Sequence, residues 1–262
     1  MTKFSIVIPA YNEENRIGST LKEYFDYFGD LKKSGKLDFE IIVVLNACKD
    51  NTLGVVEMFK CDELKILEFE RGGKGFAIVE GFKDGLKGDS EYVGFVDADG
   101  ATPASAFYDL VKSVEIEGVD GVIGDRWNEK SVINARQPFM RRFVSRGFNF
   151  IIRSLFILNH RDTQCGAKIF SRDLLEKIIP KLGSTEWTFD VDLLFYARRE
   201  KARVLSVPTV WNDKEESKIN LSKAPIRMFS SVVRLRLLHS PLSFVVRLYT
   251  KVPERFKFHH RL

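Results

Sequence analysis

The first 126 residues alternate between short apolar runs and longer amphipathic segments, and this alternation is the feature that most limits the possible folds. The longer segments carry apolar residues at helical spacing; in residues 13–28 these are Ile17, Leu21, Tyr24, Phe25 and Phe28. The apolar runs have the length of buried strands and occupy 4–11, 39–45, 64–70, 91–99 and 120–126. Strands that alternate with helices predict an α/β fold, a mostly parallel sheet with helices on both faces.

Polar or glycine-rich turns follow these predicted strands. Their sequences are "LNACKD" (45–50), "RGGKG" (71–75), "DADG" (97–100) and "GDR" (124–126). In open parallel sheets, ligands bind beyond the carboxyl ends of the strands, because the loops that follow the strands gather there. We therefore expect one binding site that is built from all four turns.

The later part of the chain has a different pattern. We expect an amphipathic helix at 139–158, a strand and two helices within 167–200, and a last strand at 202–211. Residues 225–251 are expected to be helical, with a break at Ser240-Pro241. The predicted organisation is one domain over 1–212, which includes the helix at 139–158, and a basic amphipathic helical tail over 213–262.

Length and composition exclude several classes of protein. A chain of 262 residues with 44% hydrophobic residues can bury a large core. Three widely spaced cysteines form neither a disulfide framework nor a zinc motif, and they favour a reducing compartment. No apolar stretch reaches the ~18 residues of a membrane span, and the first residues do not resemble a signal peptide.

Two basic segments stand out against an acidic remainder. Residues 126–161 and residues 213–262 each have a net charge of +7, although the whole chain has only +5. Such segments attract phosphates, nucleic acid or an anionic membrane surface. In 139–158 one helix face carries Arg142, Arg146, Asn149 and Arg153, with Phe and aliphatic residues away from it, which suits a membrane interface. The alternative is that this helix and the tail both pack on the domain as core helices.

Asp97 and Asp99 allow two interpretations. Two carboxylates at i and i+2 can bind one hard cation such as Mg²⁺ or Mn²⁺, or they can form a turn that caps the helix beginning near Pro103. A calcium-binding EF-hand is excluded, because Ala101 and Thr102 occupy positions that require an oxygen ligand and a glycine. The position at a strand end, among three other phosphate-compatible turns, favours the metal.

At this point the chain resembles a known family, the GT-A glycosyltransferases of family 2. The motifs that carry the resemblance are "IVIPAYNEE", "KDNT", "GKG" and "DADG". A narrower resemblance, to dolichyl-phosphate sugar synthases and especially their β-glucosyltransferase branch, is carried by "DADGAT", "GDR", "RRFVSRGFNFIIR", "RDTQCGAKIFSR" and "WTFDVDLLFYARR". It covers roughly 1–212 and implies a Rossmann-like GT-A sheet.

The resemblance implies an activity and its reactants. It implies inverting transfer of a hexose from a nucleotide-sugar to polyprenyl or dolichyl phosphate, at the cytoplasmic face of a membrane and with Mg²⁺ or Mn²⁺. The "DADGAT" sequence favours UDP-glucose as the donor. GDP-mannose stays open, because Leu45 and Asn46 stand where the family commonly has two aspartates.

The resemblance also assigns site residues, which fall into three groups. It places Asp97 and Asp99 at the metal, and adds Asp190, Arg126 and Arg141 as catalytic. The donor contacts are Pro9, Tyr11, Asn12, Glu13, Asn46, Asp50, Lys74, Asp97 and Asp99. The contacts to the acceptor phosphate are Arg126, Arg136, Arg141, Arg142, Gln164 and Lys168.

Several of these residues have simpler interpretations. Asn12 and Asp50 could cap the helices that follow them, and each arginine could belong to a solvated face. "RGGKG" is not a P-loop, because Gly75 follows the lysine, but glycines before a helix start do suit a phosphate. Arginine forks suit a phosphate because they form bidentate, charge-assisted hydrogen bonds.

Other functions stay open. A family-2 enzyme could act on a soluble or glycan acceptor, and it would then turn over without lipid phosphate. A sugar-nucleotide sensor without turnover is compatible with Ala101, which stands where mannosyl relatives often have a metal-binding glutamine. A nucleic-acid-binding module is disfavoured, because the basic segments are interleaved with aliphatic residues and carry no recognition motif.

Overall fold

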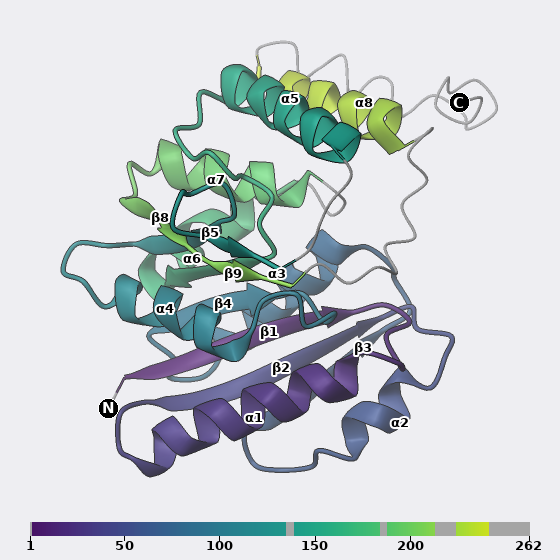
Figure 1. Ribbon diagram of the computed structural model, residues 1–262, viewed down its shortest axis with the longest axis vertical. Helices are drawn as coiled ribbons and strands as arrows, with labels where there is room; N and C mark the ends of the chain where they lie inside the picture. Colours follow the sequence, from purple (N-terminus) through teal and green to yellow (C-terminus); the bar gives the residue numbers. More distant parts are fainter. Residues whose placement is uncertain (1, 135–138, 184–187, 213–223, 241–262) are drawn as a thin grey trace.

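The computed structural model describes residues 2–134, 139–183, 188–212 and 224–240, and is organised around a seven-stranded sheet (Figure 1). The strand order is β3-β2-β1-β4-β7-β5-β8. The strands are β1 (Lys3–Ala10), β2 (Asp38–Asn46), β3 (Leu64–Phe69), β4 (Tyr92–Val96), β5 (Gly121–Asp125), β7 (Ala167–Ser171) and β8 (Val204–Pro208). A small second sheet pairs β6 (Val132–Ile133) with β9 (Val210–Trp211).

The predicted mostly parallel sheet is confirmed, with one exception inside it. β7 runs antiparallel between β4 and β5, and it pairs Phe95 with Lys168 and Val96 with Ala167. The start of β7 therefore lies beside the end of β4, directly before Asp97. The strand predicted at 202–211 is interrupted at Thr209, so that its last two residues join the second sheet.

Helices cover both faces of the sheet, as the alternating pattern predicts. One face carries α1 (Ile17–Lys33), α2 (Thr52–Glu57) and α4 (Ala104–Val114). The other carries α3 (Lys74–Gly85), α5 (Phe139–Phe156), α6 (Arg172–Ile178), α7 (Phe189–Arg199) and α8 (Ala224–Leu238). Alternation along β1 explains the division, because Ile6 and Ile8 enter the first core whereas Val7 enters the second.

Helix α5 packs on the domain and also presents an apolar surface. Ile152 and Phe156 are fully buried, whereas Phe150 is 68% and Ile157 is 60% exposed. Asn149, which the sequence places on the basic face, is buried and donates a hydrogen bond to the Arg161 carbonyl. The basic face is therefore partly turned toward the domain, because the buried Asn149 amide on that face forms a hydrogen bond with the loop that precedes β7.

Helix α8 lies beside α5 and contacts it (Figure 1). Val232 and Leu235 are buried in the second core. His239, just after α8, contacts Asp192 of α7 at 2.7 Å between Nε2 and Oδ1. α8 ends at Leu238, two residues before Ser240 of the predicted Ser240-Pro241 break, and Pro241 and the rest of the tail lie outside the described residues. In the part of the chain that the structure covers, no helix is both long enough and apolar enough to span a membrane.

Candidate active site

Lys74 and Asp97 join the turns that follow two separate strands. Lys74 is the first residue of α3, Asp97 follows β4, and Lys74 Nζ lies 2.5 Å from Asp97 Oδ1. Although burial opposes a charged amine, the carboxylates of Asp97 and Asp190 raise the pKa of Lys74 above its usual range. Lys74 therefore stays cationic at neutral pH, at a helix start where the helix dipole also stabilises an anion.

Asp99 shapes the turn after β4 and does not cap α4. Its Oδ1 accepts a hydrogen bond from the Ala101 amide at 2.9 Å. The first amide of α4, on Ala104, instead donates to Glu23 Oε1 of α1 at 2.8 Å. The interpretation of Asp97 and Asp99 as caps of α4 is therefore wrong, because a glutamate from another helix fills that role.

The two carboxylates fit a hard divalent cation. Burial raises the pKa of Asp99, and the negative charge of Asp97 raises it further, so the pair carries a repulsion that a cation would relieve. Within the residues that the structure covers, no group of three His, Cys, Asp or Glu side chains could hold an ion.

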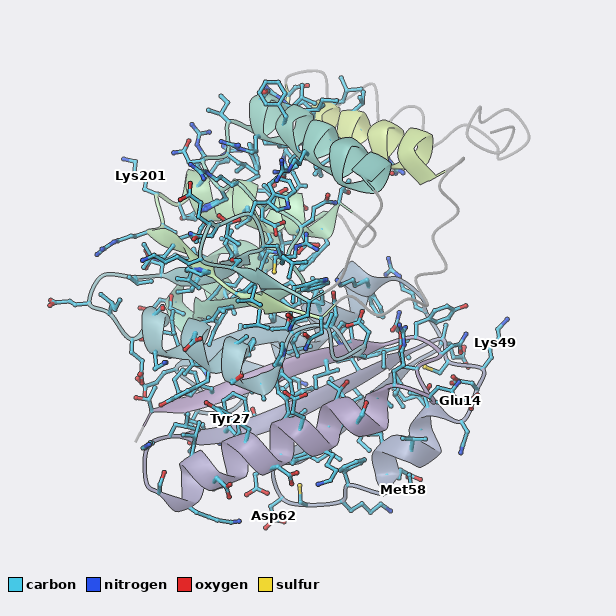
Figure 2. All side chains as sticks on the ribbon, in the orientation of Figure 1. Glu14, Tyr27, Lys49, Met58, Asp62 and Lys201 are labelled. Carbon is cyan, nitrogen blue, oxygen red and sulfur yellow. The ribbon has the colours of Figure 1, made fainter. Side chains whose placement is uncertain are left out.

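Hydrogen bonds tie the loop after β1 to the loop after β2. Asn12, in a left-handed conformation with φ 56°, accepts a hydrogen bond from the Lys49 amide at 2.7 Å. Asp50 Oδ2 accepts from the Glu14 amide at 3.2 Å, and Glu14 accepts from the Asn51 amide at 2.8 Å. Glu14 and Lys49 lie at the same end of the sheet (Figure 2). Asn12 and Asp50 thus connect two loops of the predicted donor site.

The other donor-site candidates at the end of β1 differ in how exposed their side chains are. Glu13 forms a bidentate ion pair with Arg16, at 2.6 and 2.7 Å, and Pro9 is buried at the end of β1. Tyr11 is 55% exposed and offers a free aromatic ring at this edge. The alternative that Asn12 caps the following helix is wrong, because α1 begins only at Ile17.

Asn46 is the last residue of β2, and its buried side chain links the end of β1 to the turn after β3. With its amide nitrogen facing β1, it donates to the Ala10 carbonyl at 2.6 Å and its oxygen accepts from the Gly73 amide at 3.1 Å. Both ends of the amide are therefore engaged with backbone. Asn46 holds the turn before Lys74 against the end of β1, and a nucleotide base would have to compete with these bonds.

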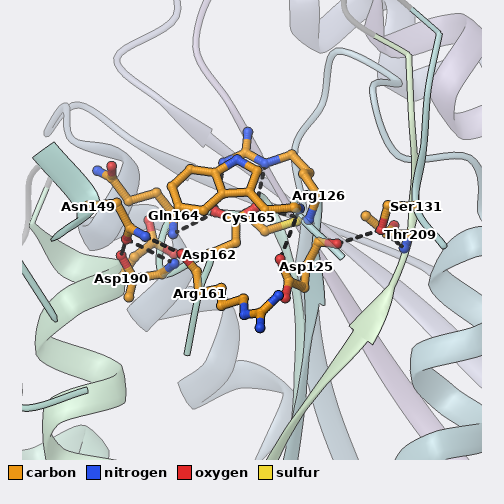
Figure 3. A network of polar contacts seen from close by, with 12 residues as sticks. Asp125, Arg126, Ser131, Asn149, Arg161, Asp162, Gln164, Cys165, Asp190 and Thr209 are labelled. Atoms are coloured by element: carbon orange, nitrogen blue, oxygen red, sulfur yellow. Dashed lines mark hydrogen bonds and ion pairs between the residues drawn. The ribbon is translucent and has the colours of Figure 1, made fainter. Parts of the chain in front are cut away.

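Arg126 is held by Asp162 in a bidentate ion pair (Figure 3). Arg126 Nε donates to Asp162 Oδ2 at 2.6 Å, and Nη2 donates to Oδ1 at 2.9 Å. Burial opposes both charges, but each partner stabilises the other, so the pKa of Arg126 is raised and the pKa of Asp162 is lowered. The guanidinium lies over the ring of Trp211, with its carbon 4.8 Å from the ring centroid.

Lys168 and Asp190 form a buried pair beside this site. Lys168 is fully buried, and its amine donates to the Cys165 carbonyl at 2.6 Å and to Asp190 Oδ1. The amine therefore serves Asp190 instead of standing free for an acceptor phosphate. Burial raises the pKa of Cys165 to about 11, so its thiol stays protonated near neutral pH and is a poor nucleophile.

The remaining acceptor candidates are placed only in part. Arg136 lies outside the described residues, and Arg141 and Arg142 lie in the first turns of α5, where the side chains are not described. Gln164 is half-buried, and its backbone N–H donates to Asp162 Oδ1 at 3.3 Å. The structure thus brings Arg126 and Gln164 together around Asp162.

The sequence gives little indication of three further residues at the site. A Cβ on Gly166 would overlap Asp97 Oδ2, so Gly166 allows β7 to start beside the aspartate. Glu23 caps α4, and Trp211 covers Arg126. Each comes from a segment distant in sequence from its partner, so no local pattern could find it.

Comparison with known proteins identifies the family of the chain. A family model described as glycosyl transferase family 2 matches residues 5–179. Proteins named dolichyl-phosphate β-glucosyltransferase are similar over most of the chain. That of Dictyostelium discoideum is 30% identical, over 88% of this chain and 73% of its own length. That of Saccharomyces cerevisiae is 31% identical, over 89% and 74%, and that of Homo sapiens is 28% identical, over 90% and 75%.

Among solved structures, glucosyl-3-phosphoglycerate synthase from Mycobacterium tuberculosis shares the fold. Its complex with UDP has a TM-score of 0.65 at 19% identity, covering 90% of this chain and 79% of that one. The same synthase has been crystallised with Mn²⁺, UDP and phosphoglyceric acid. With the matched family model and the paired aspartates after β4, these findings show that the chain belongs to glycosyl transferase family 2 and has the GT-A fold.

Proposed function

We propose that this protein transfers glucose, with inversion, from UDP-glucose to a polyprenyl or dolichyl phosphate. The observation that carries the proposal is that Lys74, Asp97, Asp99 and Arg126 gather at one end of the sheet. Trp211 lies over the Arg126 guanidinium, and the next residue, Asn212, donates its amide to the Ala101 carbonyl at 2.8 Å, so Arg126 adjoins the turn of Asp97 and Asp99. The dolichyl-phosphate β-glucosyltransferases among its relatives support both the sugar and the acceptor.

On the donor side, the chain provides positive charge for a diphosphate leaving group. Lys74 would bind the diphosphate at the start of α3, where backbone amides also point outward. Asp97 and Asp99 would hold Mg²⁺ or Mn²⁺, which when bound neutralises charge on the departing nucleoside diphosphate. Tyr11 would lie against the nucleoside, because its ring is exposed at the same edge.

On the acceptor side, no strong base is required. A phosphate monoester has a second pKa of about 6, so near neutral pH the lipid phosphate is already a nucleophile. Arg126 would orient it through charge-assisted hydrogen bonds, together with Arg141 or Arg142. Asp190 is paired with Lys168, so it would orient groups in the site.

We also propose that the α5 and α8 side of the molecule lies against the cytoplasmic face of a membrane. Phe150 and Ile151 of α5 are exposed, and so is Ile157, which directly follows the helix. Arg146 is exposed on the same helix. Val233 and Arg234 are exposed on the neighbouring α8. Apolar side chains next to arginine suit the boundary between acyl chains and anionic head groups, where the acceptor phosphate is found.

The test is a donor panel with a defined lipid acceptor. The full chain is incubated with vesicles that contain polyprenyl phosphate, one labelled nucleotide-sugar at a time, and Mg²⁺ or Mn²⁺. We expect a β-linked glucosyl lipid from UDP-glucose and loss of product with EDTA. A lipid product from GDP-mannose alone would replace the donor assignment. No lipid-linked product from any donor would overturn the proposal, and turnover with a soluble acceptor would then identify the alternative.

A further inference from the structure

The ion pair between Arg126 and Asp162 uses one edge of the guanidinium. Asp162 accepts hydrogen bonds from the single N–H of Nε and from one N–H of Nη2, and it also accepts one from the Arg126 backbone amide at 3.1 Å. A guanidinium has five N–H groups in a fixed plane, so the edge formed by Nη1 and the second proton of Nη2 is left over. Among the residues that the structure describes, no hydrogen bond takes up that edge.

Burial of the two partners is unequal. The Asp162 side chain is 1% exposed, whereas that of Arg126 is 21% exposed. The carboxylate is thus a fixed internal anchor, and the guanidinium is the part of the pair that reaches the site. The free edge has the geometry that binds a phosphate with two parallel hydrogen bonds.

Trp211 fixes the guanidinium in the remaining direction. Its ring lies against the Arg126 guanidinium, and the Asn134 amide donates to its carbonyl at 2.9 Å. The next residue, Asn212, donates its amide to the Ala101 carbonyl at 2.8 Å. The strand that carries Trp211 is therefore bonded to the turn that contains Asp97 and Asp99, and the position of Arg126 is set relative to that turn.

We propose that Asp162 and Trp211 are positioning residues that hold Arg126 with its Nη edge open toward the acceptor phosphate. The proposal rests on the proposed function, in which Arg126 binds the phosphate of a lipid acceptor. Asp162 sets the orientation of the guanidinium within its plane, and Trp211 sets its height above the donor turn. Both act through Arg126 and touch no substrate themselves.

The kinetic test separates the acceptor from the donor. Asp162→Asn keeps the shape of the anchor but removes its charge and puts an amide against one guanidinium N–H. We expect the KM for a short polyprenyl monophosphate to rise about 10-fold, with little change in the KM for the nucleotide-sugar. Trp211→Phe keeps a ring over Arg126 and should stay near wild type, whereas Trp211→Leu should raise the KM for the acceptor. Glu200→Gln, which breaks the ion pair with Lys181 at 2.6 Å, is the matched control.

A binding measurement makes the result independent of turnover. In the ¹⁵N-labelled full chain, the Arg126 Nε–H resonance, assigned with Arg126→Lys, is followed as inorganic phosphate is added. We expect a saturable shift in wild type that needs about 10-fold more phosphate in Asp162→Asn. Equal changes in both KM values, or a phosphate response unchanged by Asp162→Asn, would overturn the positioning role. A wild type that makes no lipid product but shows the phosphate shift would overturn only the proposed function.

Discussion

Lys74 Nζ lies 2.5 Å from Asp97 Oδ1, and this contact joins the turn after β3 to the turn after β4 across the ends of β2 and β1. The pair brings a helix start that suits a phosphate next to a carboxylate that suits a cation. A nucleoside diphosphate with its cation could bind to both residues at once, since its phosphate and its metal carry opposite charges.

Lys74→Met should remove the positive charge and leave the helix start intact. We expect kcat/KM for the nucleotide-sugar to fall about 100-fold, because charge stabilisation of a leaving group has that magnitude in comparable sites. Steady-state kinetics with saturating acceptor measures the effect. Lys83→Met, on the same helix and paired with Glu80, is the control and should keep wild-type activity. Full activity of Lys74→Met would contradict a role at the diphosphate.

Gly166→Ala should disturb Asp97, because the added Cβ would overlap Asp97 Oδ2. We expect the Mn²⁺ concentration for half-maximal activity to rise about 10-fold, with retained secondary structure by circular dichroism. Gly29→Ala in α1 meets no neighbouring atom and should instead stabilise the protein by about 0.5–1 kcal/mol. An unchanged metal requirement in Gly166→Ala would show that Asp97 does not bind the ion.

The pH dependence of turnover should follow the ionisation of the acceptor phosphate and not the ionisation of Lys74. The lipid phosphate becomes dianionic above its second pKa of about 6, so the rate should rise through that pH. Because its carboxylate neighbours raise the pKa of Lys74, its charge is kept at alkaline pH and the rate should stay level to about pH 9. Initial rates from pH 5 to pH 9 measure the profile. A fall between pH 7 and pH 9 would be at odds with a cationic Lys74.

Asp162→Asn should destabilise the fold in a pH-dependent way. Burial alone would raise the pKa of Asp162, but Arg126 holds it below its usual range. The folded state therefore favours the charged form, and its contribution is complete above the unfolded pKa of about 3.9 and is lost as the pH falls through the folded pKa. We expect a loss of about 2 kcal/mol at pH 7 in urea unfolding. The difference from wild type should narrow below about pH 4, and a constant difference would contradict the ion pair.

Replacement of Phe150 and Ile157 by serine should weaken membrane binding. Both side chains are largely exposed, so their removal should cost little stability. The partition coefficient onto anionic vesicles should fall about 10-fold or more. Vesicle sedimentation measures binding, and turnover with a short soluble polyprenyl phosphate checks that the site is intact. Met58→Ser, at an exposed position on α2's side of the molecule, is the control. Equal binding of both variants would place the membrane contact elsewhere.

The strands through β5 and the helices between them were predictable from the sequence, because each of these elements carries its own local signal. Buried strands are short apolar runs, and helices between them show apolar residues at a spacing of three and four. The gathering of "RGGKG" and "DADG" also follows, since parallel strands bring their carboxyl ends to one edge. The contact between Lys74 and Asp97 is an example of that rule.

The tertiary structure alone decided what surrounds these residues. β7 enters antiparallel between β4 and β5, which sets Gly166 against Asp97 and Lys168 against Asp190. Asn149 has the pattern of a solvated polar residue but is buried, because the Arg161 carbonyl and the Thr163 hydroxyl satisfy its amide. Pairings between distant segments depend on packing of the whole chain, and local periodicity records only which side of an element is apolar.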